Sequence, residues 1–179
     1  ENWADKTDLG TLKSDHSGLS YVNALSADGK IAAGGADNDA GNGRAVVWSG
    51  ENWADKTDLG TLKSDHSGLS SVRALSADGK IAAGGADNDA GKERAVVWSG
   101  ENWADKTDLG TLKSDHSGES AVQALSADGT VALGVAETDT YDAPATALWR
   151  IRYGGAAPTP PSATATVSYT HLTLPTSEL

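Results

Sequence analysis

Asp15, His16 and Ser17 bring together the three side-chain types of a hydrolase triad, in which a carboxylate orients an imidazole that activates a hydroxyl nucleophile. The motif recurs in "TLKSDHSG" at 61–68 and 111–118. Consecutive residues point to different sides of a strand or turn, so they cannot align as orienter, base and nucleophile. Three equivalent copies also differ from an active site, where different groups converge in one pocket. We therefore predict a turn between two strands and expect no enzyme.

Two loops rich in carboxylates offer hard oxygen ligands. "DNDAGNG" (37–43) and "DNDAGKE" (87–93) resemble a calcium loop in composition, but their spacing is not that of an EF-hand and no Glu closes them at the twelfth position. The third copy reads "ETDTYDA" (137–143), and such hairpin loops are common without metal. We expect no cofactor, with calcium as the alternative. Its candidate ligands are Asp37, Asp39, Asp87 and Asp89.

The six tryptophans form two groups of three. One group ends the most strand-like segment of each copy, where we expect it to pack in a core: Trp48, Trp98 and Trp149. The other group sits beside a turn: Trp3, Trp53 and Trp103. An exposed indole in this second group could stack on a glycan. Core packing is the favoured interpretation, and sugar binding is the alternative.

These motifs recur because the whole sequence repeats every fifty residues. Residues 51–100 differ from residues 1–50 only at the equivalents of positions 21, 23, 42 and 43. The third copy, 101–153, follows closely through Gly129 and then diverges, with one inserted residue. A period of this length lies in the range of propeller blades and other β arrays.

Each copy contains four short strand signals separated by turns, and no convincing helix. The first four after residues 1–9 are "YVNALS" (21–26), "KIAAGGA" (30–36), "RAVVWSG" (44–50) and, at the start of the second copy, "NWADKTDL" (52–59). The pattern predicts an all-β fold of tandem four-stranded antiparallel meanders that resemble propeller blades. The chain holds about three blades (1–50, 51–100, 101–153), and rings need about 4–8. We therefore expect an incomplete β-propeller, in which only residues 1–9 could supply the fourth strand of the last blade.

The differences between the copies indicate which strand face is exposed. Positions 19, 21 and 23 vary, whereas the intervening Val22 and Ala24 are the same in every copy. Variation with a period of two predicts one packed and one free face. The free face supplies the predicted contact residues: Tyr21, Asn23, Ser71, Arg73, Ala121 and Gln123.

The elements "DLGTL", "ALSADGKIAAGGA" and "RAVVW", in this order, resemble the HAF-type bacterial extracellular repeat. That repeat runs Asp-Leu-Gly-Thr-Leu, an Asn- or Asp-Gly hairpin, a Gly-bearing strand and His-Ala-Phe-Leu-Trp. Residues 44–48 replace the last element, so the family's His is absent. The resemblance covers about 1–153. It implies propeller-like repeats of a bacterial surface or secreted protein, including autotransporter passengers.

Composition limits the classes of partner. A net charge of −11 argues against nucleic acid, and the absence of Cys excludes disulfides and thiolate metal sites. No apolar run approaches the ~20 residues of a membrane span, so we expect no membrane insertion within this fragment. The chain starts inside a repeat without Met, and we expect it to be a fragment of a longer protein.

The remaining segment differs in composition. Residues 154–166 form a Gly/Ala/Pro/Thr linker. "VSYTHLTLPT" (167–176) resembles a translated sequencing adapter of metagenomic reading frames, and we interpret 167–179 as a disordered artefactual tail.

Together these observations predict a non-catalytic extracellular repeat module, an autotransporter passenger fragment that mediates adhesion or interaction. Its partner would be an unknown protein or glycan surface ligand, contacted by several weak sites that sum by avidity. The predicted location is extracellular or the bacterial cell surface, associated with the outer membrane in the parent protein. The alternative is a lectin-like glycan-binding β-propeller.

Overall fold

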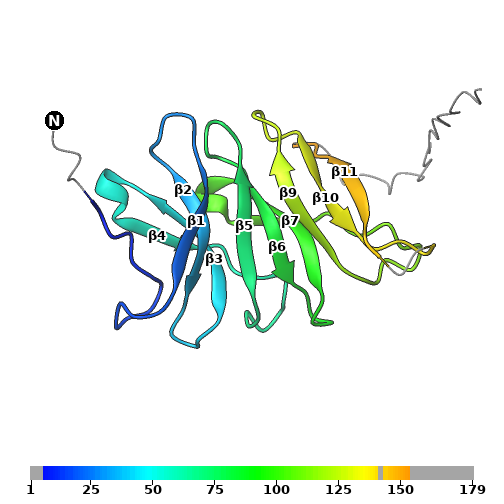
Figure 1. Ribbon diagram of the computed structural model, residues 1–179, viewed down its shortest axis with the longest axis horizontal. Coiled ribbons are helices and arrows are strands. Elements are labelled where there is room, and N and C mark those ends of the chain that lie inside the picture. The colour runs from blue at the N-terminus through cyan, green and yellow to red at the C-terminus, as the bar shows by residue number, and fades with distance from the viewer. Residues whose placement is uncertain (1–5, 141–142, 154–179) are drawn as a thin grey trace, which may run out of the picture.

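A computed structural model describes residues 6–140 and 143–153, and within these residues the fold is all-β (Figure 1). Trp3, the linker 154–166 and the tail 167–179 lie outside the described residues. The first sheet contains β1 (Ser20–Leu25), β2 (Ala32–Asp37), β3 (Gly43–Ser49) and β4 (Asp55–Asp58). The second contains β5 (Ser70–Leu75), β6 (Ala82–Asp87), β7 (Glu93–Ser99) and β8 (Asp105–Asp108). The third contains β9 (Ser120–Leu125), β10 (Val131–Ala136) and β11 (Ala145–Arg150).

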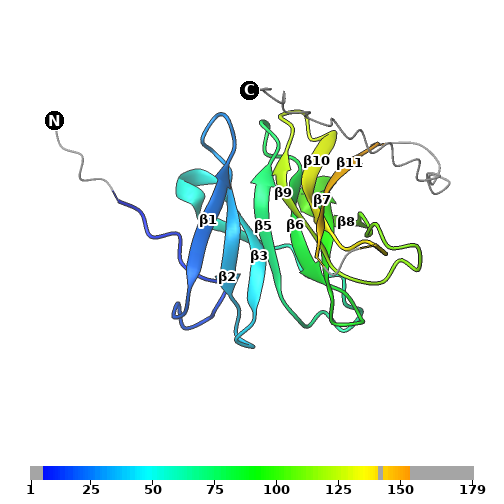
Figure 2. The same cartoon turned by 45° about the vertical axis from the view of Figure 1, so that its right-hand side comes forward.

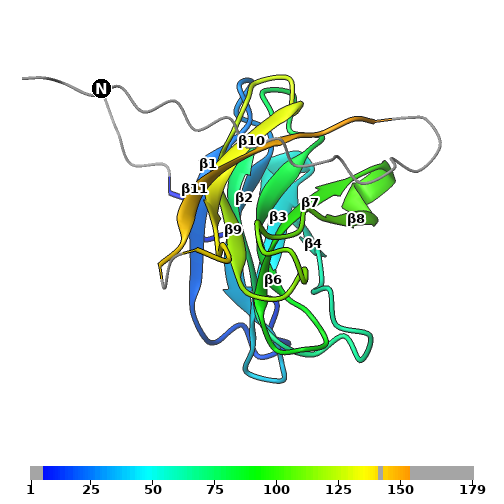
Figure 3. The same cartoon turned by 90° about the vertical axis from the view of Figure 1, so that its right-hand side faces the viewer.

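Each sheet is an antiparallel meander in chain order, and we call the three sheets the first, second and third blade. The blades stack face to face, as Figures 1 and 2 show. Strands β1, β5 and β9 contact one another in succession, and in the end-on view of Figure 3 the blades lie one behind the other. The sheets do not close into a ring, so the predicted open arrangement of propeller-like blades is confirmed.

The core lies between consecutive blades. We call the face that meets the next blade in the chain the rear face and the opposite one the front face. At the first junction, Ala45 and Val47 of the first blade pack against Val72, Val96 and Trp98 of the second, and all five are fully buried. The second junction repeats this arrangement with equivalent residues. Burying a Val side chain contributes about 1.5–3 kcal/mol, so the blades stabilise one another rather than themselves.

A β-bulge in the first strand of each blade corrects the predicted alternation of faces. Val22 pairs with Gly34 and Ala24 with Ala33, so Asn23 is an extra residue in β1. An extra residue reverses the faces that follow it. In the second blade Leu75 therefore joins Val72 on the front face, whereas Ala74 pairs with Ala83 and turns to the rear face. The prediction that positions 22 and 24 share one face is therefore wrong.

The predicted strand 52–59 is also too long. Glu51–Trp53 forms a 3-10 turn (η1), in which Asn52 and Trp53 adopt left-handed φ values of 55° and 53°, and β4 begins only at Asp55. The equivalent turn, η2 (Glu101–Trp103), precedes β8. Left-handed residues cannot continue a strand, and a Trp in this conformation is uncommon.

The fourth strand of the third blade is missing from the described residues, where β11 is an edge strand. Residues 6–9 do not supply this strand within the chain. Leu9 and Leu12 instead pack against the front face of the first blade, beside Val46 and Trp48.

Candidate functional site

Two loops of each copy are joined at one end of each blade. In the first copy, the backbone N–H and the hydroxyl of Ser14 both donate to Asp39 Oδ1, at 2.8 and 3.0 Å. The N–H of Leu19 donates to Asp37 Oδ2 at 2.9 Å. The second copy repeats these bonds with Ser64, Asp89, Leu69 and Asp87. The carboxylates of these loops therefore hold the chain in place.

The Asp-His-Ser motif forms a turn, as predicted. In the second copy, Asp65 Oδ1 accepts hydrogen bonds from the N–H and hydroxyl of Ser67, at 2.9 and 2.7 Å. These bonds stabilise the carboxylate and lower the pKa of Asp65. His66 has a left-handed φ of 58°, and its side chain is exposed.

The predicted calcium ligands are the same carboxylates that accept these backbone bonds. Asn38 Oδ1 accepts from the N–H groups of Ala40 and Asn42, and these bonds close the loop. Within residues 6–140 and 143–153, no three His, Cys, Asp or Glu side chains come together as a metal site would require. The absence of a cofactor stays a prediction, with calcium at 37–43 and 87–93 as the alternative.

The tryptophans divide much as expected. Trp48 and Trp98 are fully buried, and their indole N–H groups donate to the carbonyls of Leu9 and Leu59 at 3.0 Å. Trp103 is half-buried, and its indole N–H donates to the Gly79 carbonyl at 3.0 Å. Trp53 is also half-buried and contacts the first-blade core. Neither side chain projects freely from the turn.

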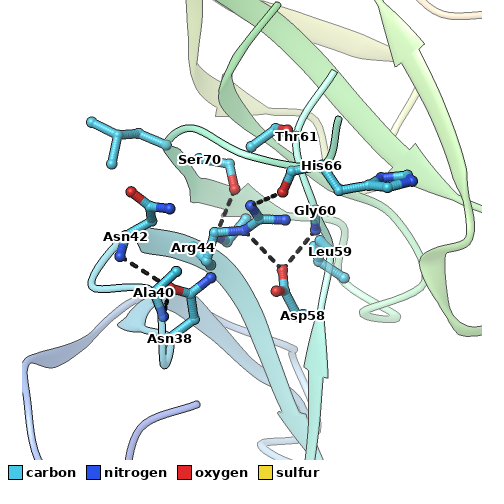
Figure 4. Close-up of polar contacts among 12 residues, drawn as sticks. Asn38, Ala40, Asn42, Arg44, Asp58, Leu59, Gly60, Thr61, His66 and Ser70 are labelled. Atoms are coloured by element: carbon cyan, nitrogen blue, oxygen red, sulfur yellow. Dashed lines mark hydrogen bonds and ion pairs between the residues drawn. The ribbon is translucent and has the colours of Figure 1, made fainter. Parts of the chain in front are cut away.

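A buried arginine ties each of the first two blades to the loop that leads to the next blade, and none of the motifs in the sequence pointed to it. Arg44 is buried, and its Nη1 donates to the carbonyl of His66 at 2.8 Å (Figure 4). Its Nε lies 3.3 Å from Asp58 Oδ1, which also accepts from the N–H of Gly60. Beside it, the N–H of Ala45 donates to the Ser70 hydroxyl at 2.9 Å. We call this set the arginine clasp.

The second junction has the same clasp, built from Arg94, Asp108 and the His116 carbonyl. Its signal in the sequence is an Arg that begins an otherwise apolar strand in both copies. The third copy has Ala145 at the equivalent register position, opposite Ala136.

Four of the predicted contact residues lie at or near the junctions rather than on a free face. Asn23 Nδ2 donates to the Val72 carbonyl of the next blade at 2.8 Å, and Arg73 Nη2 lies 2.6 Å from Glu93 Oε1. Tyr21 is 42% exposed. Ala121, which pairs with Val135 in the third blade, is buried. Tyr21, Asn23 and Gln123 are exposed, whereas Ser71 and Arg73 are half-buried, so the variable positions do not form one free face.

The first junction carries a shallow groove of about 340 Å³. We call it the junction groove. It is lined by Tyr21, Gly43, Leu69, Ser70, Ser71, Gly85, Asp87 and Glu93. The structure thus brings Tyr21 from the first blade together with Ser71 and Glu93 from the second. Gln123, in the third blade, does not line it.

Comparison with known proteins supports the fold. No family model and no curated protein matches the chain. The chain is similar to the crystal structure of TolB from Acinetobacter baumannii, with a TM-score of 0.52 and 20% identity over 77% of this chain. TolB contains a β-propeller, so the likeness supports propeller-like blades. The chain spans 33% of that structure's length.

Proposed function

We propose that the chain is a non-catalytic binding module of a bacterial surface or secreted protein, and that it binds a partner protein in the junction groove. The observation that carries the proposal is where the differences between the first two copies lie. The copies differ at only four positions, and residues at two of them, 21 and 43 with their equivalents 71 and 93, line this groove. A third position supplies Arg73, which pairs with Glu93 of the groove.

The chemistry of the groove suits a segment of another protein. Tyr21 offers an aromatic ring and a hydroxyl, and the neighbouring Leu69 is an exposed apolar side chain. Tyrosine is enriched in protein interfaces because one side chain supplies both kinds of contact. Asp87 and Glu93 add carboxylates to the wall, which favours a partner with basic side chains. The repeated, rigidly held loops on either side limit the entropy lost on binding.

The test uses substitutions that the chain itself offers. Peptides that bind the full chain are first selected from a displayed random library. Their affinity is then measured for two variants, each of which replaces one residue of the first copy by its equivalent in the second. Tyr21→Ser removes the ring from the groove, and we expect at least a tenfold loss of affinity. Asn42→Lys changes a residue outside the groove lining, and we expect affinity to stay within twofold. Equal affinities for both variants, or no selected peptide, would refute the proposal.

A glycan-binding function is the second candidate, supported by a different surface. Trp53, Asn52, Lys30 and Ser49 line a shallow pocket beside η1, where a ring face and polar groups lie together. A glycan array distinguishes the two functions. Sugar binding that is lost in Trp53→Ala but kept in Tyr21→Ser would favour the lectin.

A further inference from the structure

The front face of the first blade exposes residues that the other blades bury. Val22 is 47% exposed, whereas its equivalents Val72 and Val122 are 0% exposed because a preceding blade covers them. Leu25 is also exposed, whereas Leu75 packs into the core of the first junction. The first blade thus carries the same residues at these positions as the second, and they are exposed because no blade precedes it in the described residues.

The rear face of the third blade is open in the complementary way. Leu148 pairs with Leu133 in the register that joins Val97 to Ala83 in the second blade. Val97 and Ala83 are fully buried, whereas Leu148 is 53% exposed and Leu133 is 44% exposed. The third copy therefore presents larger apolar side chains here than the covered blades do. A cap that faced solvent would carry polar side chains at these positions.

The N-terminal segment follows the path of a fourth strand. Residues 5–8 repeat the sequence Asp-Lys-Thr-Asp of β4 and β8. Leu9 and Leu12 contact the first blade as Leu59 and Leu62 contact the second-blade core. In the described residues 6–8, however, no strand pairs with this segment. The segment therefore occupies the place of the fourth strand of a preceding blade, and the other three strands of that blade are not supplied by the described residues of this chain.

The hairpin turns give the direction in which blades add. The N–H of Ala27 donates to the Ala77 carbonyl at 2.8 Å, and the N–H of Ala77 donates to the Ala127 carbonyl at 2.8 Å. Within the described part of the chain, this row of bonds begins with the Ala27 carbonyl and finishes with the Ala127 N–H. An acceptor therefore stands at one open end and a donor at the other, as head-to-tail continuation requires.

We propose that a second copy of this chain docks head to tail on the first. The front face of its first blade covers Leu133 and Leu148, and its residues 6–8 pair with β11 as the missing fourth strand. By the register that joins β7 to β8, Lys6 would lie opposite Trp149 and Thr7 opposite Leu148. The contact continues the geometry of the two junctions already present in each chain, and it is heterologous.

Two copies joined in this way at both ends contribute six blades, three from each, which lies within the roughly 4–8 blades of closed propellers. The new junction lacks an arginine clasp because Ala145 stands in place of Arg44 and Arg94. It is therefore weaker than the junctions within a chain, and the assembly dissociates on dilution.

Sedimentation velocity of the full chain over a concentration series tests the proposal. We expect a monomer that becomes a dimer as concentration rises. Val22→Asp alters only the front open face and Leu148→Asp only the rear one, and each variant alone should lose dimerisation. An equimolar mixture should recover a one-to-one dimer held by one intact junction, in which the unmodified rear face of one variant meets the unmodified front face of the other. Leu112→Asp, which changes a similarly exposed leucine in the loop between β8 and β9, should dimerise as the unmodified chain does.

Other outcomes would overturn the proposal. A monomer at every concentration would show that no second copy covers these faces. A mixture that stays monomeric would exclude head-to-tail docking, and species larger than a dimer would exclude the two-copy ring. Circular dichroism of each variant, matched to the unmodified chain, separates lost assembly from lost folding.

Discussion

Arg44 lies in β3 of the first blade and His66 in the loop that leads to the second, and Nη1 of Arg44 donates a hydrogen bond of 2.8 Å to the His66 carbonyl. Because the guanidinium is buried, Arg44→Met removes the donor of this carbonyl and the ion-pair partner of Asp58, which keeps only the N–H of Gly60. We expect the free energy of unfolding in urea to fall by about 1.5–3 kcal/mol. Lys92→Met removes an exposed ion pair with Glu119 and should cost less than about 1 kcal/mol. Equal losses would contradict a structural role for the clasp.

Gly84 is required by the bulge of the second blade. A Cβ at this position would collide with the main-chain carbonyl of Ser71, which cannot move without breaking the pairing of β5 and β6. Gly84→Ala should therefore lower the free energy of unfolding by about 1–3 kcal/mol. The matched control is Gly43→Ala, where an added Cβ meets no atom within 4 Å, and its change should stay within about 0.5 kcal/mol. If both variants unfold alike in urea, the bulge does not need its glycine.

Tyr153 gives the third blade a pH-dependent contact. Its hydroxyl donates to the Gly129 carbonyl at 2.9 Å, and burial together with the Asp128 carboxylate raises its pKa from 10.0 to about 12. A raised pKa means that the folded state favours the protonated phenol. Its contribution to stability is therefore full below pH 10 and is lost as pH rises towards about 12.

The comparison of the unmodified chain with Tyr153→Phe isolates this contribution. The difference in urea midpoint between them should be largest below pH 10 and should shrink between pH 10 and about 12. A difference that is constant over this range would rule out a titrating contact.

Calcium is expected to leave the stability unchanged. The Asp39 carboxylate already accepts two hydrogen bonds from Ser14, and a metal would have to compete with them. A ligand present at 100 times its Kd stabilises a folded state by about 2.7 kcal/mol, which a thermal melt detects. We expect the same melting temperature in millimolar calcium and in chelator. A rise with calcium that disappears in Asp39→Asn would instead establish the site.

The elements that depend on local chemistry could be predicted from the sequence. Gly29 takes a φ of 71° in the hairpin expected from Ala-Asp-Gly, and Trp48 is buried at the end of the strongest strand signal. The turn at His16 was predicted because its neighbours are turn residues. In each case the determining contacts lie within a few residues of one another.

Features that depend on a neighbouring blade could not be predicted. Nothing in the sequence marks Asn23 as the extra residue of a bulge, although the glycine opposite it at 34 is consistent with one. The partner of Arg44 is a main-chain carbonyl, which any residue type could supply. The junction groove likewise exists only because Tyr21 and Glu93, which are 72 positions apart in the sequence, meet across two blades.

Strands β4 and β8 have identical sequences, so side-chain contacts do not determine which of them pairs with β3 and which with β7. Proximity along the chain makes the choice, because five residues separate β3 from β4 and 55 separate it from β8. The entropy of closing the longer loop disfavours the wrong pairing by only about 2 kcal/mol. Synthesis from the N-terminus, which completes the first blade before β8 exists, removes this ambiguity. Refolding of the whole chain from denaturant restores it, and strand-exchanged species are the expected by-product.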